Sequence, residues 1–454
     1  HGVYGFQRIG TSYRHRMNTS GDWRATPMWE RLSPAVVGNV PLTYPATEVD
    51  GKLVTGMMTP EPGEGFTHPP ALGEEIAERV PDYAIGLDWG EYADRQQAFL
   101  DDLDGLLANR VELLELLMAT EDWELFFFVF TALDRLKHLV WDESVILDYY
   151  RTMDDVLGDV LAYVEDRGAT LYVVSDHGFG PISRIVHVNR LLESAGYLTR
   201  QRESGTRGVL SSLGVTKSNV ETWLDRSGIG QDALVDYLPQ AFVDMVALQV
   251  PGEHSLYDVD FEETAAFFHG SGELYVNDTE RFERGTVRPE AVPALKRELT
   301  SLLETAEDPE TGVRPLTVHD GDDVYPTDEE SPDLVVTPDP EYDCLTMLTD
   351  EAFSDPGSKA GGHRSEGVFL AWGPDVDAGA TVEEASVVDV APTVLHGAGE
   401  AIPEATDGRV LREVFAEGSA PDSAAVERRP LTGRHDDGSR DGSGEDDGDV
   451  EERL

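Results

Sequence analysis

Apolar residues along the chain alternate between helical spacing and short continuous runs, a pattern that predicts an α/β fold. They recur at helical spacing over residues 100–119 and again over 144–167, where Gly168 ends the second pattern. Two continuous apolar runs, 125–130 and 170–174, have the length of strands that are buried on both faces. Because a strand, a helix and a strand follow one another in this order, we expect a parallel sheet.

Four further apolar runs predict strands, at residues 35–40, 273–276, 334–336 and 368–371. The rest of residues 1–86 is rich in Gly, Pro and Thr and is typical of loops. A helical, polar pattern without strands over 201–249 favours a cap inserted over the main sheet. After about Phe415 apolar residues almost disappear, which predicts a disordered tail. We therefore predict a main α/β domain in two pieces, at residues 1–200 and 273–414. A helical cap at 201–272 is inserted between them, and an acidic tail follows at 415–454.

The charge of the chain is strongly acidic, with 88 Asp and Glu against 35 Lys and Arg and a formal net charge of −53. Nucleic-acid binding through basic patches is therefore not expected. Only five of the 35 basic residues are Lys, which leaves 30 Arg. Such a surface stays hydrated where abundant salt screens its self-repulsion, so the composition favours a salt-adapted cytoplasm and resembles halophilic archaeal proteins. An acidic protein without a salt requirement is the alternative.

Cys344 is the only cysteine, so an intrachain disulfide and a thiolate metal cluster are both excluded, and a cytoplasmic location is favoured. The sequence contains no run of 18 or more apolar residues, so no membrane span is predicted. The chain opens on His1 within a segment that reads as structured, so we expect further residues upstream. A signal peptide there stays an open alternative.

Asp and His residues follow the predicted strands at two places. Asp134 and His138 stand four residues apart in a helical pattern, so both side chains would lie on one helix face. The alternative is that Asp134 caps the following helix and His138 is an ordinary surface residue. Asp176 and His177 end the run TLYVV before two glycines, in a turn where both side chains could hold one metal ion, and a polar turn that merely ends a strand is the alternative.

A third candidate is His363, which follows two glycines and is expected on a flexible loop beside the strand at 368–371. An exposed loop histidine is the alternative. Together the two Asp and three His are too many ligands for one tetrahedral zinc, so the set implies two divalent ions, Zn²⁺ or Mn²⁺. Two ions roughly 3.5–4 Å apart can hold the attacking and leaving oxygens of a phosphoryl transfer.

Other polar and aromatic residues near these motifs have simpler interpretations. His187 lies between two valines and is expected to pack in the structure rather than to bind metal. The neighbouring cations are expected to be solvated, although they could touch phosphate oxygens, and these are Arg135, Lys137 and Arg364. The nearby aromatic residues are expected in the core, although they could line a pocket, and these are Tyr44, Phe179 and Trp372.

Four segments, ALDRLKHLVWD, VVSDHGFGP, GGHRSEGVFLAWGP and SVVDVAPTVLHGAGEAIPEATDGRVL, occur in this order. The series resembles the type I phosphodiesterase/nucleotide pyrophosphatase branch of the alkaline phosphatase superfamily over about residues 1–411. The resemblance implies an alkaline-phosphatase-like α/β three-layer sandwich with a mostly parallel central sheet. It also implies hydrolysis of phosphodiester or pyrophosphate bonds in a small phosphate ester or nucleotide.

Site roles follow from the same resemblance. Asp134, His138 and His363 would bind one metal ion, and Asp176 and His177 would contribute to the other. The family's nucleophile, a Thr or Ser, would precede His1 together with a further Asp ligand, so the catalytic residue itself is unknown. A phosphomonoesterase or phosphomutase of the same superfamily is the alternative, and so is a catalytically inactive module that binds metal. The sequence does not indicate an oligomeric state.

Overall fold

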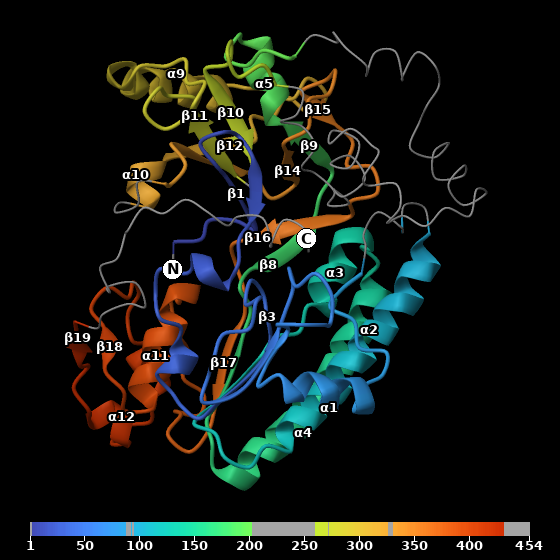
Figure 1. Cartoon of the computed structure of the whole chain (residues 1–454), viewed down its shortest axis with the longest axis vertical. Helices are drawn as coiled ribbons and strands as arrows, with labels where there is room; N and C mark the ends of the chain where they lie inside the picture. The colour runs from blue at the N-terminus through green and yellow to red at the C-terminus, as the bar shows by residue number, and fades with distance from the viewer. Residues whose placement is uncertain are drawn as a thin grey trace.

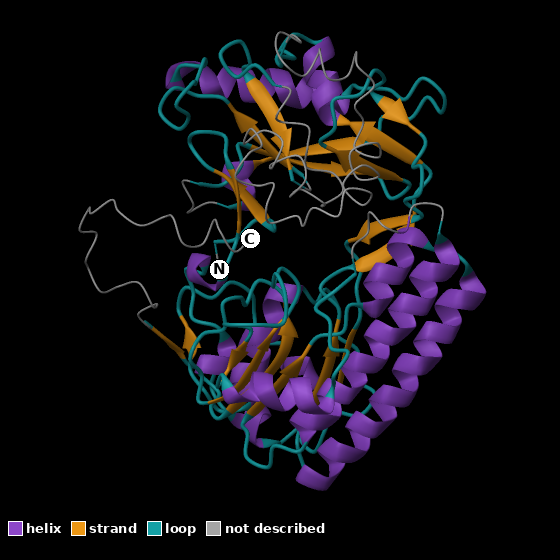
Figure 2. Cartoon of the chain, turned by 45° about the vertical axis from the view of Figure 1, so that its right-hand side comes forward, coloured by secondary structure: helices purple, strands orange, loops and turns teal. Residues whose placement is uncertain are grey.

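The computed structural model describes residues 2–87, 92, 95–201, 259–270, 272–325 and 330–430. An upper and a lower group of strands, each with its own helices, lie one above the other in the view of Figure 1. The ladder of β8 (Gly178–Pro181) and β16 (Gly361–Arg364) lies between them. Figure 2 shows the same two layers of strands from a second direction. The fold is α/β, as the alternation of helical spacing and short apolar runs predicts.

The lower sheet has the order β5-β4-β3-β6. Its central strand β3 (Ala35–Val40) pairs in parallel with β4 (Gly51–Thr55) and with β6 (Leu125–Phe128). The short β5 (Thr67–His68) pairs antiparallel with β4. The strand predicted at 35–40 is therefore confirmed with its bounds. The centre of this sheet is parallel, but the two strands from which a parallel sheet was expected, at 125–130 and 170–174, lie in different ladders.

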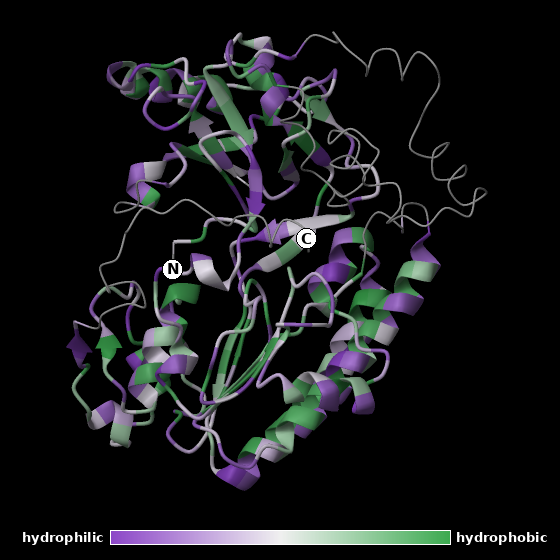
Figure 3. Ribbon diagram, viewed as in Figure 1, coloured by the Kyte–Doolittle hydropathy of each residue, from purple (hydrophilic) through white to green (hydrophobic). Residues whose placement is uncertain are grey.

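Side chains of β3 alternate between two buried clusters because successive residues of a strand point to opposite faces. Val36 packs with Leu113 and Leu117, which belong to α2 (Gln96–Met118). Val37 packs on the other face with Trp29 and with Leu53. Figure 3 shows apolar residues gathered on the strands of this sheet and on the helix surfaces that meet them. Both faces of β3 are thus covered, which explains its uninterrupted apolar run.

A short helix, a long helix and the strand β7 (Leu171–Val174) follow β6 along the chain. The short α3 (Ala132–Leu139) leads into α4 (Glu143–Arg167). Asp142 caps α4 by accepting hydrogen bonds from the backbone N–H groups of residues 144 and 145, and Gly168 ends it with φ 62°, a left-handed conformation that favours glycine. The helix end read from Gly168 is therefore confirmed.

β7 pairs antiparallel with β17 (Phe369–Trp372) and forms a ladder separate from the four-stranded sheet. Within the part of the chain that is described, β6 pairs only with β3, and β7 pairs only with β17. The strand expected to be buried on both faces at 125–130 ends at Phe128, and its residues are only partly buried. The reason is its position at a sheet edge beside a large cavity.

The upper part of the molecule contains the antiparallel sheet β10-β11-β13-β12, covered by α9 (Val292–Glu304). The strands predicted at 273–276 and 334–336 are confirmed as β11 and β13. The four strands are β10 (Ala266–His269), β11 (Glu273–Val276), β13 (Leu334–Pro338) and β12 (Leu316–Asp320). A second sheet, β14-β9-β15, lies beside it with α5 (Val188–Ser194), and its strands are Tyr342–Leu345, Arg184–His187 and Phe353–Ser354.

The structure corrects the expectation that residues 1–86 are mainly loops around one strand. The hairpin of β1 (Gln7–Ile9) and β2 (His15–Met17), the strands β4 and β5, and the helix α1 (Ala71–Arg79) also lie there. The hairpin is held by tertiary contacts, because Tyr13 at its turn stacks on Phe261 and Phe282. Strands of two or three residues are too short to leave a period in the sequence.

Two predicted boundaries are also wrong. The cap expected at 201–272 cannot be helical to its end, because β10 lies at 266–269, while 202–258 lies outside the described residues. Residues 415–430 do not belong to the disordered tail expected from 415, since α12 (Ala420–Ser423) and β19 (Arg428–Arg429) are ordered. Phe415 is buried against α11 (Val390–Gly397) and β18 (Ile402–Pro403), which anchors this segment. Residues 431–454 lie outside the described part. No helix within that part is long and apolar enough to cross a membrane.

Candidate metal centre

Asp134 and His138 lie one turn apart on α3, directly after β6. Leu136 between them is fully buried and holds this helix against the core. The Nε2 atom of His138 is 3.6 Å from Oδ1 of Asp134, so the two side chains share one face, as their spacing predicts. The alternative in which Asp134 is a helix cap is wrong, because Thr131 is the N-cap of α3 and Asp142 caps the next helix.

His177 reaches the same carboxylate from the turn between β7 and β8 (Gly178–Pro181). Its Nδ1 donates a hydrogen bond to the carbonyl oxygen of Gly178 at 3.0 Å, which leaves Nε2 with a lone pair. That Nε2 is 3.7 Å from Oδ1 of Asp134 and 3.6 Å from Oδ2 of Asp176. The carboxylate of Asp176 is 83% exposed and lies at the rim of the group. The hydrogen bond thus fixes the tautomer that a metal ligand needs.

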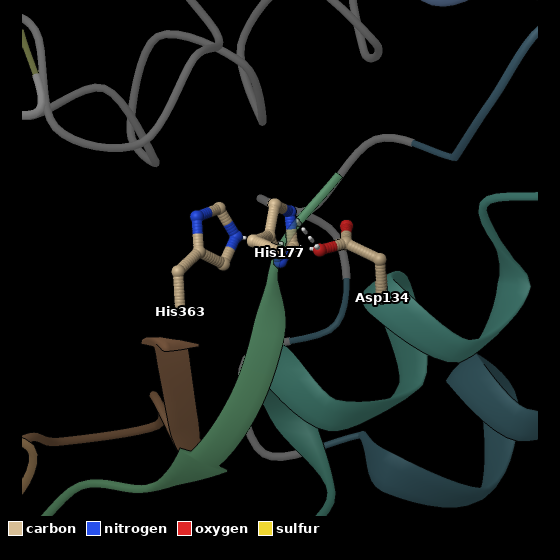
Figure 4. A group of neighbouring side chains, drawn as sticks. All are labelled: Asp134, His177 and His363. Atoms are coloured by element: carbon tan, nitrogen blue, oxygen red, sulfur yellow. Dashed lines mark ion pairs between the residues drawn. The ribbon is translucent and has the colours of Figure 1, made fainter. Parts of the chain in front are cut away.

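His363 belongs to β16 (Gly361–Arg364), so the expectation of a flexible loop is wrong. β16 pairs antiparallel with β8 and sets His363 opposite Phe179. The Nε2 atom of His363 is 3.3 Å from Oδ1 of Asp134 and 3.2 Å from Nε2 of His138. Figure 4 shows Asp134, His177 and His363 turned toward one another from three different elements. A paired strand positions an imidazole more firmly than a loop does.

Burial and the neighbouring charges shift the pKa of His138 in opposite directions, and they do the same to the pKa of Asp134. Burial lowers the pKa of His138 to about 4, even though the carboxylate of Asp134 favours the charged imidazole. For Asp134 burial raises the pKa, but the hydrogen bond from His363 and the nearby imidazoles outweigh it and hold the pKa below its usual value. A neutral imidazole beside an ionised carboxylate is the state in which both bind a metal ion.

The donor set suits a divalent cation. One oxygen of Asp134 and the ring nitrogens of His177 and His363 lie within 4.8 Å of one another, and His138 adds a fourth donor at 3.6 Å from the same oxygen. Three imidazole nitrogens and one carboxylate are ligands that Zn²⁺ accepts in tetrahedral sites. Asp134, His138, His177 and His363 therefore converge in one place, with Asp176 beside them.

Glycines allow the strands that carry these ligands to approach closely. A Cβ atom on Gly361 would lie 2.6 Å from the carbonyl oxygen of Lys137 and 2.9 Å from the ring of Phe179. A Cβ on Gly178 would lie 1.8 Å from the carbonyl oxygen of Glu366. Side chains at these two positions would push β16 away from α3 and from β8, so the glycines are required by packing.

Phe179 forms a wall of the site, and the core position expected for it is therefore wrong. Its ring lies 4.8 Å from that of His138 and 5.3 Å from that of His363, centroid to centroid. The ammonium group of Lys137 stands 5.1 Å above the same ring. Lys359, which the sequence reading did not single out, bonds to Asp343 and lowers the pKa of His138 through its charge. No motif spacing could have indicated Lys359, because Asp343 belongs to a different sheet.

The remaining candidates lie outside the group of ligands. His187 is buried in β9 and bonds through Nε2 to Ser354 at 2.9 Å, which fits the expected packing role. Arg135 is 3% exposed, so the expectation of a solvated surface residue is wrong for it. The guanidinium of Arg364 donates to backbone carbonyl groups, including that of His363. The two other aromatic candidates are partly or well exposed rather than core residues, and these are Tyr44 and Trp372.

The sequence and the structure were compared with known families and proteins. The family described as "Type I phosphodiesterase / nucleotide pyrophosphatase" matches residues 1–367. Human ectonucleotide pyrophosphatase/phosphodiesterase 5 shares 12% identity at a TM-score of 0.43, over 91% of this chain and 83% of that chain. The murine protein shares 12% identity at 0.44, over 92% and 84%, both alone and as an inactive variant in complex with AMP. No curated protein sequence matches the chain. With most of its length matched, the chain belongs to the type I phosphodiesterase/nucleotide pyrophosphatase family and is a hydrolase of phosphoric esters.

Proposed function

We propose that the chain hydrolyses phosphodiester or pyrophosphate bonds with two divalent metal ions, Zn²⁺ or Mn²⁺. The observation that carries this proposal is the convergence of three imidazole nitrogens on one carboxylate oxygen, Oδ1 of Asp134, at 3.3 to 3.7 Å. Imidazole nitrogens and a carboxylate oxygen that converge in this way are the ligands that a divalent cation such as Zn²⁺ binds. Family membership supports a phosphoric ester as the substrate.

We assign the ligands to the two ions as the family resemblance implies. Asp134, His138 and His363 would hold one ion, and Asp176 and His177 would hold part of the other. The distance of 3.6 Å between Oδ2 of Asp176 and Nε2 of His177 is consistent with a shared ion. When bound, the ions would polarise the phosphoryl group and neutralise the charge that develops on its oxygens. The two ligand sets lie side by side because Asp134 contacts members of both.

Four residues of the chain prepare the site. The hydrogen bond from His177 to Gly178 keeps Nε2 available, and the lowered pKa of His138 keeps its imidazole neutral at neutral pH. Phe179 packs beside the rings of His138 and His363 and helps to hold them in place. Lys137 stands at this wall, where an ammonium group can meet a phosphate oxygen. The nucleophile, a Thr or Ser, would come from residues N-terminal to His1.

We further propose the finer features of the architecture and setting. They comprise an alkaline-phosphatase-like three-layer sandwich with a mostly parallel central sheet, a cap formed from part of 201–272, and a salt-rich cytoplasm as the working environment. The net charge of −53 supports the last of these. A nucleotide is the substrate class we favour, since it fits the type I phosphodiesterase/nucleotide pyrophosphatase family.

Hydrolysis of bis-p-nitrophenyl phosphate, compared with p-nitrophenyl phosphate, tests the proposal. The chain is prepared with its native upstream residues and assayed in molar salt with added Zn²⁺ or Mn²⁺. We expect faster cleavage of the diester, with loss of at least a hundredfold in His363→Ala and on chelation. The matched control is His319→Ala, which removes an exposed histidine from β12 and should leave turnover unchanged.

Each alternative predicts a different result in the same assay. Faster cleavage of the monoester would replace the diesterase proposal with a phosphomonoesterase or phosphomutase of the same superfamily. Metal binding without turnover of either substrate would support a catalytically inactive module that binds metal.

A further inference from the structure

A second close pair of imidazoles lies in the upper part of the molecule. His15 of β2 and His269 of β10 meet where the β1–β2 hairpin contacts the upper sheet, and Figure 1 shows β1 beside that sheet. The Nδ1 atom of His15 is 3.0 Å from Nε2 of His269, and the ring centroids are 4.9 Å apart. The pair shares no residue with the candidate metal centre.

The geometry of this pair matches that of two imidazoles in the candidate metal centre. There, Nε2 of His138 and Nε2 of His363 are 3.2 Å apart, and the ring centroids are 5.0 Å apart. A tetrahedral zinc ion at about 2.0–2.1 Å from each ligand separates two ligand nitrogens by about 3.3–3.4 Å. Only a small shift of the rings is therefore needed to admit an ion between His15 and His269.

Both rings are neutral at neutral pH and can offer a lone pair. His269 is 4% exposed, and burial lowers its pKa to about 3. Burial lowers the pKa of His15 as well. Two neutral imidazole nitrogens at this distance share either one proton or one cation. A hydrogen bond between the rings is therefore the alternative to a metal ion, and the neighbouring groups distinguish the two.

An unpaired amide oxygen lies on the same side of the hairpin as His15. Gln7 lies opposite Met17 in the β1–β2 ladder, and Met17 is two residues from His15 on the same strand. Opposite and alternate residues of a ladder share a face, so Gln7 and His15 both point inward, as the burial of the two strands also shows. The Oε1 atom of Gln7 is buried and accepts no hydrogen bond. A buried oxygen of this kind needs a donor or a cation.

A buried carboxylate lies opposite His269 on the neighbouring strand. His269 and Glu273 are paired in the β10–β11 ladder, which sets their Cβ atoms about 4.5–5.5 Å apart. Glu273 is 8% exposed. Its oxygens do not lie within 4.8 Å of both nitrogens of the pair, so it contributes negative charge rather than a ligand atom. A negative charge in this poorly solvated place favours a cation between the two neutral rings.

We propose that His15 and His269 bind one divalent cation, Zn²⁺ or a similar borderline ion, and that the amide oxygen of Gln7 and water complete its coordination. Imidazole nitrogens suit Zn²⁺ better than Mg²⁺ or Ca²⁺, which prefer oxygen ligands. A hairpin of two three-residue strands is marginal on its own. The ion would join the hairpin to the upper sheet at a second point, besides the stacking of Tyr13 on Phe261. The proposal does not rest on hydrolysis at the candidate metal centre.

Amide hydrogen exchange, with and without saturating Zn²⁺ in molar KCl, tests the proposal segment by segment. In the unchanged chain we expect Zn²⁺ to slow exchange at residues 7–17 at least tenfold, because the hairpin would have to release the ion before it opens. His15→Gln keeps a polar side chain on the hairpin but removes the imidazole, so it should abolish this slowing. His269→Gln removes the other ligand and should do the same. The matched control is His319→Ala, which removes an exposed histidine from β12 and should keep the slowing.

Equal exchange at residues 7–17 with and without Zn²⁺ in the unchanged chain would overturn the proposal, and the two rings would then share only a hydrogen bond. This comparison does not depend on how well a variant folds. Slowing that persists in both His15→Gln and His269→Gln would also overturn the proposal, since Zn²⁺ would then act from elsewhere on the acidic surface. Asp134→Asn should keep the slowing, because the two sites share no ligand. Loss of turnover in Asp134→Asn bears only on the proposed function.

Discussion

Replacing Asp134 by Asn tests whether its carboxylate is the common ligand of the site. The change keeps the size of the side chain and its place on α3 but removes the negative charge that three imidazoles face at 3.3 to 3.7 Å. Structural zinc sites are worth roughly 10–16 kcal/mol. One of the three ligands assigned to this ion would then supply about 3–5 kcal/mol, which corresponds to a loss of at least roughly a hundredfold in Kd.

Isothermal titration with Zn²⁺, in molar KCl at pH 7, measures this loss. The control is Asp148→Asn, which removes the same charge from an exposed position on α4, where Asp148 forms an ion pair with Arg151. We expect Asp148→Asn to bind like the unchanged chain. Equal zinc affinity in Asp134→Asn and in the unchanged chain would refute the reasoning, because the three imidazoles would then bind without their carboxylate.

Four further expectations concern stability. Asp308 is fully buried and accepts two hydrogen bonds from Arg184, at 2.9 and 3.2 Å, so Asp308→Ala should lower the free energy of unfolding in urea by roughly 3–5 kcal/mol. Glu310 is an exposed partner of the same Arg184, so the control Glu310→Gln should cost less than about 1 kcal/mol. Leu136→Ala should cost about 2–5 kcal/mol in the same assay, since Leu136 is fully buried under the ligand helix; no loss would contradict the packing described. Burial lowers the pKa of His269 to about 3, so the unfolded chain takes up a proton that the folded chain does not; the free energy of unfolding should fall between pH 6.5 and 3, less steeply in His269→Asn, and equal slopes would contradict this. The melting temperature should rise between 0.1 and 2 M KCl, because the Debye length falls from about 10 Å to under about 3 Å and screens the acidic surface; a flat response would refute salt adaptation.

Much of the fold could be predicted where burial leaves a period in the sequence. Residues 273–276 and 35–40 form strands with the expected bounds, and the end of α4 follows from Gly168. In these elements local preference and tertiary burial agree. The prediction for 125–130 is only partly confirmed, since the strand ends at Phe128 and its residues are partly buried at a sheet edge beside the cavity.

The short elements could not be predicted, because tertiary contacts hold them. The β1–β2 hairpin depends on Tyr13, whose hydroxyl donates to Asn277 at 2.6 Å, and both stacking partners of its ring lie more than 200 residues further along the chain. The candidate site divides in the same way. The pairing of Asp134 with His138 follows from helical spacing, whereas the approach of His363, 225 residues from His138, could be anticipated only from the family resemblance.

Anomalous scattering from crystals of the chain soaked in Zn²⁺ tests the central claim most directly. We expect a zinc peak within roughly 2.0–2.2 Å of Oδ1 of Asp134 and of imidazole nitrogens of His138 and His363. A second peak is expected beside Asp176 and His177. Zinc bound only elsewhere on the acidic surface, with these side chains still in direct contact, would contradict the assignment of a hydrolytic metal centre.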